Sequence, residues 1–177
     1  MCRVILLVLW LALSMATAHA ADDSPLSPFG FLAGHCWSGE FEESGATDTH
    51  CYTWVFGGKH LRDVHVVSGE EPDYRGETIY SVEGTSGDII FRYWNSLGGV
   101  SDGRIELEDG AILAPGGTYV GEDGKAREFR SSLRQIDDMH YEALTEERID
   151  DEWRNFSRVT FTRTNSIPTA PDAPITR

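Results

Sequence analysis

The stretch CWSGEFEESGATDTHCYTWVFGG, residues 36–58, has the pattern of two β-strands joined by a tight turn at Ser44-Gly45. On each side of the turn, residues of one kind recur at every second position, as expected for strands with one buried face. One face is mostly aromatic, whereas the other carries serine, threonine, glutamate and two cysteines. This contrast is typical of an antiparallel sheet that covers a core on one side. The aromatic face consists of Trp37, Gly39, Phe41, His50, Tyr52, Trp54 and Phe56.

The two cysteines of this hairpin suggest its register. If Cys36 faces Cys51, the turn falls at Glu43-Ser44, in agreement with the independent turn signal of Ser44-Gly45. In this register both cysteines lie on the outer face. We therefore expect a disulfide between Cys36 and Cys51 that staples the first hairpin, with two buried thiols as the alternative.

The rest of the chain repeats the alternation of strand and turn. Turn signals, among them Gly-Gly and Asp-Gly pairs that suit tight hairpins, are separated by roughly 8–12 residues, and no long stretch has a helical period. Strands joined by short hairpins leave open edges unless the sheet closes. We therefore predict an all-β, up-and-down antiparallel barrel of about ten strands. The expected strands are 36–43, 47–56, 60–67, 75–82, 89–95, 100–107, 111–120, 127–136, 139–147 and 153–163.

The inward face of segment 60–67 depends on the length of the turn at Gly57-Gly58. A turn of two or four residues directs the odd-numbered side chains inward, including Asp63 and His65. A three-residue turn directs the even-numbered side chains inward. Their apolar content slightly favours this second arrangement, and both remain open. The even-numbered set contains Arg62, Val64 and Val66.

Residues 1–20 have the features of a cleaved signal peptide. Arg3 precedes the unbroken apolar run from Val4 to Leu13, and Ala18-His19-Ala20 has the small-residue spacing that a signal peptidase recognises. The run is shorter than the roughly 20 residues of a membrane span. We therefore expect a periplasmic or secreted protein with no stable membrane span after cleavage. Loss of Cys2 would leave two cysteines in an oxidising compartment.

The remaining sequence divides into three parts: a polar leader at 21–28, one barrel domain at 29–163, and a proline-containing tail at 164–177 that we expect to be disordered. The full chain of 177 residues carries 15 Lys+Arg against 29 Asp+Glu, a formal net charge of -14. Nucleic acids and anionic membrane surfaces both attract proteins through an excess of cations, so neither is an expected partner. The sequence does not indicate the oligomeric state.

The sequence Phe31-Leu32-Ala33-Gly34-His35-Cys36-Trp37-Ser38-Gly39 resembles the opening of calycin-type barrels. In lipocalins and their bacterial relatives, a short helical turn leads to Gly-x-Trp at the first strand, and the tryptophan plugs one end of the barrel. Here the spacing from Gly34 to Trp37 is one residue longer. The chain is most similar to exported bacterial lipocalin-like domains of unknown function, which share a Gly-Gly after the second strand. The resemblance implies a barrel with an internal cavity and carries no established activity.

The strand pattern directs tyrosine, tryptophan and histidine toward the inside of this barrel. We therefore expect the cavity to bind a small apolar or amphipathic molecule, without a cofactor or a metal. A binding protein is favoured over an enzyme. The candidate ligand-binding residues are Trp37, His50, Tyr52, Trp54, His65, Tyr80 and Tyr93.

Two other functions remain open. One is an enzyme that uses His50 or His65 as acid or base, with Tyr80, Tyr93 or Asp63 as partner. The other is a non-catalytic envelope interaction module, which would expose an apolar patch.

Two further groups invite a chemical interpretation. A single histidine such as His50 could ligate a haem, and a few residues of segment 60–65 could join it around a metal, but a hydrogen-bonded polar site is preferred. The sequence 99–103 matches the Gly-x-Ser-x-Gly elbow of serine hydrolases. It lies between expected strands instead of before a helix, so we interpret it as a coincidence.

Overall fold

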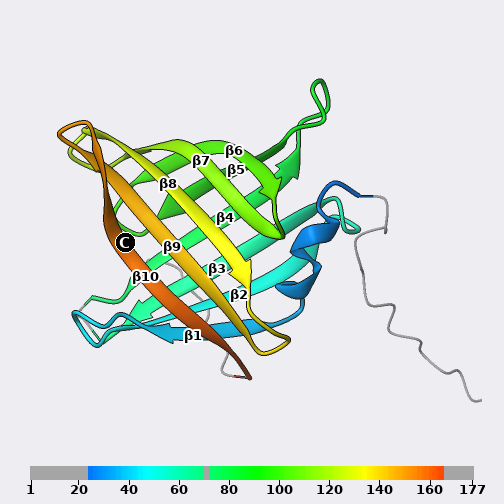
Figure 1. Cartoon of the computed structure of the whole chain (residues 1–177), viewed down its shortest axis with the longest axis horizontal. Helices are drawn as coiled ribbons and strands as arrows, with labels where there is room; N and C mark the ends of the chain where they lie inside the picture. Colours follow the sequence, from blue (N-terminus) through cyan, green and yellow to red (C-terminus); the bar gives the residue numbers. More distant parts are fainter. Residues whose placement is uncertain (1–23, 70–71, 166–177) are drawn as a thin grey trace, which may run out of the picture.

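The computed structural model describes residues 24–69 and 72–165 (Figure 1). The predicted signal peptide at 1–20, the first part of the predicted leader, and all but the first two residues of the predicted tail lie outside these ranges.

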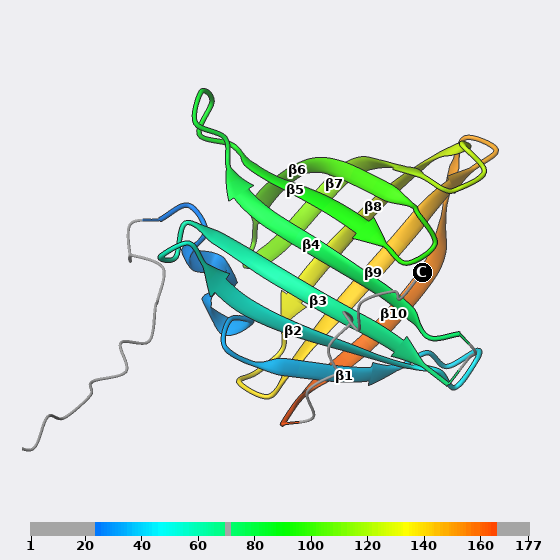
Figure 2. The ribbon, with the colours of Figure 1, turned by 180° about the vertical axis from the view of Figure 1, so that it is seen from behind.

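Ten antiparallel strands form a closed barrel, which confirms the predicted fold class and strand number. Each strand pairs with the next along the chain, and β10 closes the barrel against β1 (Figures 1 and 2). This architecture is consistent with a calycin-like fold. The strands are β1 (Cys36–Glu40), β2 (Thr47–Val55), β3 (His60–Ser68), β4 (Tyr74–Val82), β5 (Ile89–Asn95), β6 (Val100–Glu108), β7 (Ala111–Val120), β8 (Ala126–Gln135), β9 (His140–Ile149) and β10 (Glu152–Thr164).

A short 3-10 helix, η1 (Ser27–Phe31), closes one end of the barrel (Figure 1). The sequence carries Pro28 in its first turn, where the missing N–H costs nothing. Phe29 is fully buried, and its ring centroid lies 4.8 Å from that of Tyr80. The indole of Trp37, also fully buried, donates a hydrogen bond of 3.2 Å to the carbonyl oxygen of Leu32. No helix within residues 24–69 and 72–165 is long and apolar enough to cross a membrane.

The first hairpin has the predicted register. Cys36 pairs with Cys51 across β1 and β2, and the two form a disulfide with their Cα atoms 4.1 Å apart. Trp37, which pairs with His50, is buried inside the barrel, so the neighbouring disulfide lies on the outer face.

The turn between β2 and β3 contains four residues, 56–59, because Val55 pairs with His60. The odd-numbered side chains of β3 therefore point inward, and Asp63 and His65 are buried. The slight preference for the even-numbered set was wrong. The even-numbered set is the more apolar one, but it lies on the outer face, where Arg62 forms an ion pair with Glu77 on β4. The polar side chains of Asp63 and His65 can be buried because they find hydrogen-bond partners inside the barrel.

Candidate functional site

A cavity of about 670 Å³ occupies the inside of the barrel. Most of its lining is aromatic or aliphatic, with contributions from nearly every strand. Ser44 in the β1–β2 turn and Phe156 near the start of β10 also line it, and both are exposed. The β1–β2 turn and the start of β10 lie at the end of the barrel opposite η1 (Figure 2). Because exposed residues of these two segments line the cavity, it reaches solvent at that end.

The structure brings most of the predicted site residues to this cavity. The five that line it are His50, Tyr52, His65, Tyr80 and Tyr93. Trp37 and Trp54 lie elsewhere: Trp37 is part of the closed end, and Trp54 packs against the hydrophobic core. Asp63, the expected partner of a catalytic histidine, also lines the cavity.

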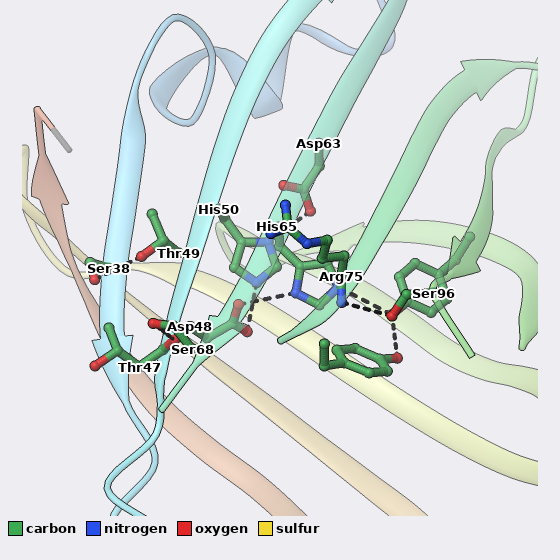
Figure 3. A network of polar contacts seen from close by, with 12 residues as sticks. Ser38, Thr47, Asp48, Thr49, His50, Asp63, His65, Ser68, Arg75 and Ser96 are labelled. Carbon is green, nitrogen blue, oxygen red and sulfur yellow. Dashed lines mark hydrogen bonds and ion pairs between the residues drawn. The ribbon is translucent and has the colours of Figure 1, made fainter. Parts of the chain in front are cut away.

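His50 lies between two carboxylates on the cavity wall (Figure 3). Its Nδ1 is 2.8 Å from Oδ2 of Asp63, and its Nε2 is 3.0 Å from Oδ2 of Asp48. A carboxylate only accepts hydrogen bonds, so both contacts are satisfied when His50 is an imidazolium that donates from both nitrogens.

His65 extends this arrangement across the sheet. Its Nδ1 donates to Oδ1 of Asp48 at 3.0 Å, and its Nε2 is hydrogen bonded to the hydroxyl of Tyr93 at 3.1 Å. The hydroxyl of Tyr93 is in turn 2.5 Å from that of Tyr74. One continuous network therefore links β2, β3, β4 and β5. We call Asp48, His50, Asp63, His65, Tyr93 and Tyr74 the polar wall.

Gly76 on β4 makes room for the centre of the polar wall. A Cβ atom at this position would collide with Nε2 of His65 and lie 2.6 Å from the hydroxyl oxygen of Tyr93. Since any other residue has that atom, the contact between His65 and Tyr93 depends on glycine here.

Opposite charges in the polar wall stabilise each other. Burial disfavours the ionised form of Asp48, but His50 and the hydrogen bonds from both histidines outweigh this and hold the pKa of Asp48 well below its usual value. Burial likewise disfavours the imidazolium of His50. The charges and hydrogen bonds of Asp48 and Asp63 nevertheless raise the pKa of His50 well above its usual value. The pair is thus charged near neutral pH.

Three buried phenols line the cavity close enough to Asp63 to be affected by its charge. Burial raises the pKa of Tyr52, Tyr80 and Tyr141 above the ordinary phenol value, and the negative charge of Asp63 raises it further. The hydroxyls of Tyr52 and Tyr141 are 3.4 Å apart. These groups stay protonated near neutral pH and can donate hydrogen bonds inside the barrel.

Two buried side-chain polar atoms of the described residues have no hydrogen-bond partner, Oδ1 of Asp63 and Oγ of Ser101. Ser101 belongs to the Gly-x-Ser-x-Gly sequence, which lies at the β5–β6 turn and within β6. The strand continues through it without turning into a helix, so this serine is not held on a hydrolase elbow.

The structure also bears on the metal and haem interpretations. Both ring nitrogens of His50 are hydrogen bonded to carboxylates, so a haem iron would have to displace one of these contacts. Ligand atoms of Asp48, His50 and His65 lie within 4.8 Å of one another and could hold a metal ion.

Sequence reasoning missed Asp48, Tyr74 and Tyr141. Asp48 precedes His50 by two residues on the same strand, so the period of two could have placed it on the inner face. Tyr74 lies one residue before the expected strand 75–82, and Tyr141 lies within an expected strand that showed no chemical motif.

Comparison with known proteins finds no family model and no curated protein that matches this chain.

Proposed function

We propose that this protein binds a small apolar or amphipathic molecule inside the barrel. The observation that carries the proposal is the cavity itself. Its volume of about 670 Å³ falls among ligand pockets, which span roughly 300–1,000 Å³. Its combination of many apolar side chains with a few converging polar groups is also typical of such pockets.

The two kinds of lining suggest how the molecule lies. The apolar part would contact ring and aliphatic side chains such as Phe91, Ile112 and Phe161. A polar group would face Tyr93 or His50, whose side chain is 18% exposed. An amphipathic molecule satisfies both surfaces, whereas a purely apolar one leaves the polar wall without added partners.

Export is part of the same proposal. The signal-peptide pattern at 1–20 and the disulfide between Cys36 and Cys51 both suit a periplasmic or secreted protein. The alternative of an envelope interaction module would use exposed apolar side chains. The two most exposed ones, Phe56 and Phe156, lie toward opposite ends of the barrel, whereas Trp94, Leu97 and Val100 are exposed together at the β5–β6 hairpin.

Native mass spectrometry of the protein purified from its own host tests the proposal. We expect a fraction of the protein to carry one small molecule, which organic extraction releases for identification. After delipidation, the same molecule should rebind at one per chain. A protein that carries no adduct and rebinds nothing from the extract would overturn the proposal.

A second candidate function is acid–base catalysis on the bound molecule. It is favoured by the chain from Asp48 through His65 to Tyr93, in which a carboxylate orients an imidazole that is hydrogen bonded to a hydroxyl at the cavity wall. In this function the hydroxyl of Tyr93 would donate a proton to the substrate or accept one from it. His65 would in turn supply a proton to Tyr93 or accept one from it.

The substitution Tyr93→Phe separates catalysis from binding. If the extracted molecule is a substrate, the unmodified protein converts it to a species of new mass, and Tyr93→Phe binds it without conversion. If the protein only binds, both proteins return the molecule unchanged.

A further inference from the structure

We propose that Asp48, His50 and His65 form a binding site for one divalent transition metal ion of the zinc and cobalt class. The three residues come from two adjacent strands, β2 and β3, and their ligand atoms lie within 4.8 Å of one another. Two imidazoles and one carboxylate are a common ligand set for such ions in proteins. This inference goes beyond ligand binding in the cavity and does not depend on it.

The arrangement around the two histidines is the main support. Each imidazole directs one nitrogen to Asp48 and the other to a group outside the ligand set. For His50 that group is the carboxylate of Asp63 at 2.8 Å, and for His65 it is the hydroxyl of Tyr93 at 3.1 Å. Histidines that bind metals almost always hydrogen bond in this way through their second nitrogen, which fixes the tautomer and the ring orientation.

The charges are also suited to a cation. Asp48 and Asp63 bring two carboxylates into a buried wall, and both are less than one-tenth exposed. A divalent ion between Asp48 and the two histidines would replace the protons that Asp48 now accepts. His50 would lose its Nε2 proton and keep its Nδ1–H, directed at Asp63. His65 would bind the ion through Nδ1 as the tautomer that carries its N–H on Nε2, directed at Tyr93.

Binding requires a modest rearrangement of the rings. Ligand atoms around a tetrahedral zinc ion at bond lengths of about 2.0–2.2 Å are separated by about 3.3 Å. The rings of His50 and His65 now stack with their planes 15° apart, so at least one must turn before both lone pairs meet at one point. The adjoining cavity provides space for this rotation and lets a water or a bound molecule occupy the fourth position.

Cobalt titration of the metal-free protein tests the site without any organic ligand. We expect one equivalent of Co²⁺ to produce the visible absorption bands of a low-symmetry four-coordinate ion, and Zn²⁺ to displace it. His65→Ala should weaken binding by about 100-fold or more. His60→Ala is the matched control and should bind like the unmodified protein, because His60 is on the same strand and its Nδ1 contacts Ser81 outside the site.

Two further variants keep the test decisive if His65→Ala fails to fold. Asp63→Asn retains all three ligands and should weaken binding by about 10- to 100-fold. His65→Cys should add a near-ultraviolet charge-transfer band from thiolate to cobalt, which arises only if residue 65 binds the ion. Absence of the visible bands in the unmodified protein would overturn the proposal, as would identical titrations of His65→Ala and His60→Ala.

Discussion

The imidazole rings of His50 and His65 stack face to face, with their centroids 4.7 Å apart and their planes 15° apart. Both donate to the same carboxylate, Oδ2 and Oδ1 of Asp48 respectively. A substitution of Asp48 therefore removes a hydrogen bond from both rings at once, and the effects of substitutions at these three residues on stability should not be additive.

Asp48→Asn should destabilise the protein. The amide carries no charge to balance the imidazolium of His50, and its nitrogen cannot accept a hydrogen bond from either histidine. We expect the free energy of unfolding in urea to fall by about 3 kcal/mol, as when one partner of a buried ion pair is removed. Glu77→Gln is the control: its partner Arg62 lies on the outer face, and the loss should stay below about 1 kcal/mol.

The stability difference between the unmodified protein and Asp48→Asn should depend on pH. Because the pKa of Asp48 is lowered in the folded protein, its charge stabilises the fold fully above pH 3.8, the ordinary pKa of Asp. This stabilisation is lost as the pH falls through the pKa of Asp48 in the folded protein. Because the pKa of His50 is raised, its charge stabilises the fold fully below pH 6.5, the ordinary pKa of His, and this stabilisation is lost as the pH rises through the pKa of His50 in the folded protein. Urea titrations should therefore show the largest difference between about pH 4 and 6.5. A difference that grows steadily above pH 6.5 would contradict this.

Gly76→Ala should separate His65 from Tyr93. The added methyl group collides with both side chains, and overpacking of this kind costs about 1–3 kcal/mol. The hydroxyl contact should also lengthen, which a crystal structure of the variant can measure. Gly116→Ala is the matched control on β7, where the added methyl meets nothing within 4 Å, and a similar loss there would refute the steric explanation.

Phe29→Ala tests the closed end of the barrel. Removal of this fully buried ring should lower the free energy of unfolding by about 3–5 kcal/mol and leave a space beside Tyr80. Phe56→Ala removes the same side chain from a turn where it is 81% exposed, and its effect should stay within about 0.5 kcal/mol. Equal losses in thermal or urea unfolding would show that η1 does not hold this end of the barrel.

The double substitution Cys36→Ser and Cys51→Ser should cost about 2–3 kcal/mol, because the disulfide closes a short loop. The bond lies on the outer face, so ligand affinity measured below the unfolding transition should stay unchanged. A loss of binding in the folded double variant would show that the disulfide shapes the cavity.

Local sequence signals were sufficient for the fold. The turn at Ser44-Gly45 and the pair Cys36 and Cys51 independently gave the register of the first hairpin, and repeated turn dipeptides gave the ten strands. The orientation of β3 was harder to predict because a face with Asp63 and His65 looks too polar to be buried. Only contacts with other strands make that face stable, and a single strand does not reveal them.

The candidate site was predicted only in part for the same reason. His50 and His65 stood out as histidines among aromatic residues, but Asp48 resembled the many acidic residues of an acidic chain. Its role depends on two rings that approach it from β2 and β3. Trp37 indicated the closed end of the barrel. The limits of the cavity could not be predicted, because they depend on how side chains fill the barrel, and Trp54 packs against the core instead of lining the cavity.

Titration with the neutral apolar dye N-phenyl-1-naphthylamine tests most directly whether the cavity binds ligands. Ser131 on β8 lines the cavity, and its neighbour Ser132 points to the other face of the same strand. We predict one dye per chain for the unmodified protein, the same affinity for Ser132→Trp, and an affinity weaker by about tenfold or more for Ser131→Trp, because the indole fills part of the cavity. Failure of the unmodified protein to bind the dye, or equal affinities for the two tryptophan variants, would contradict a ligand site inside the barrel.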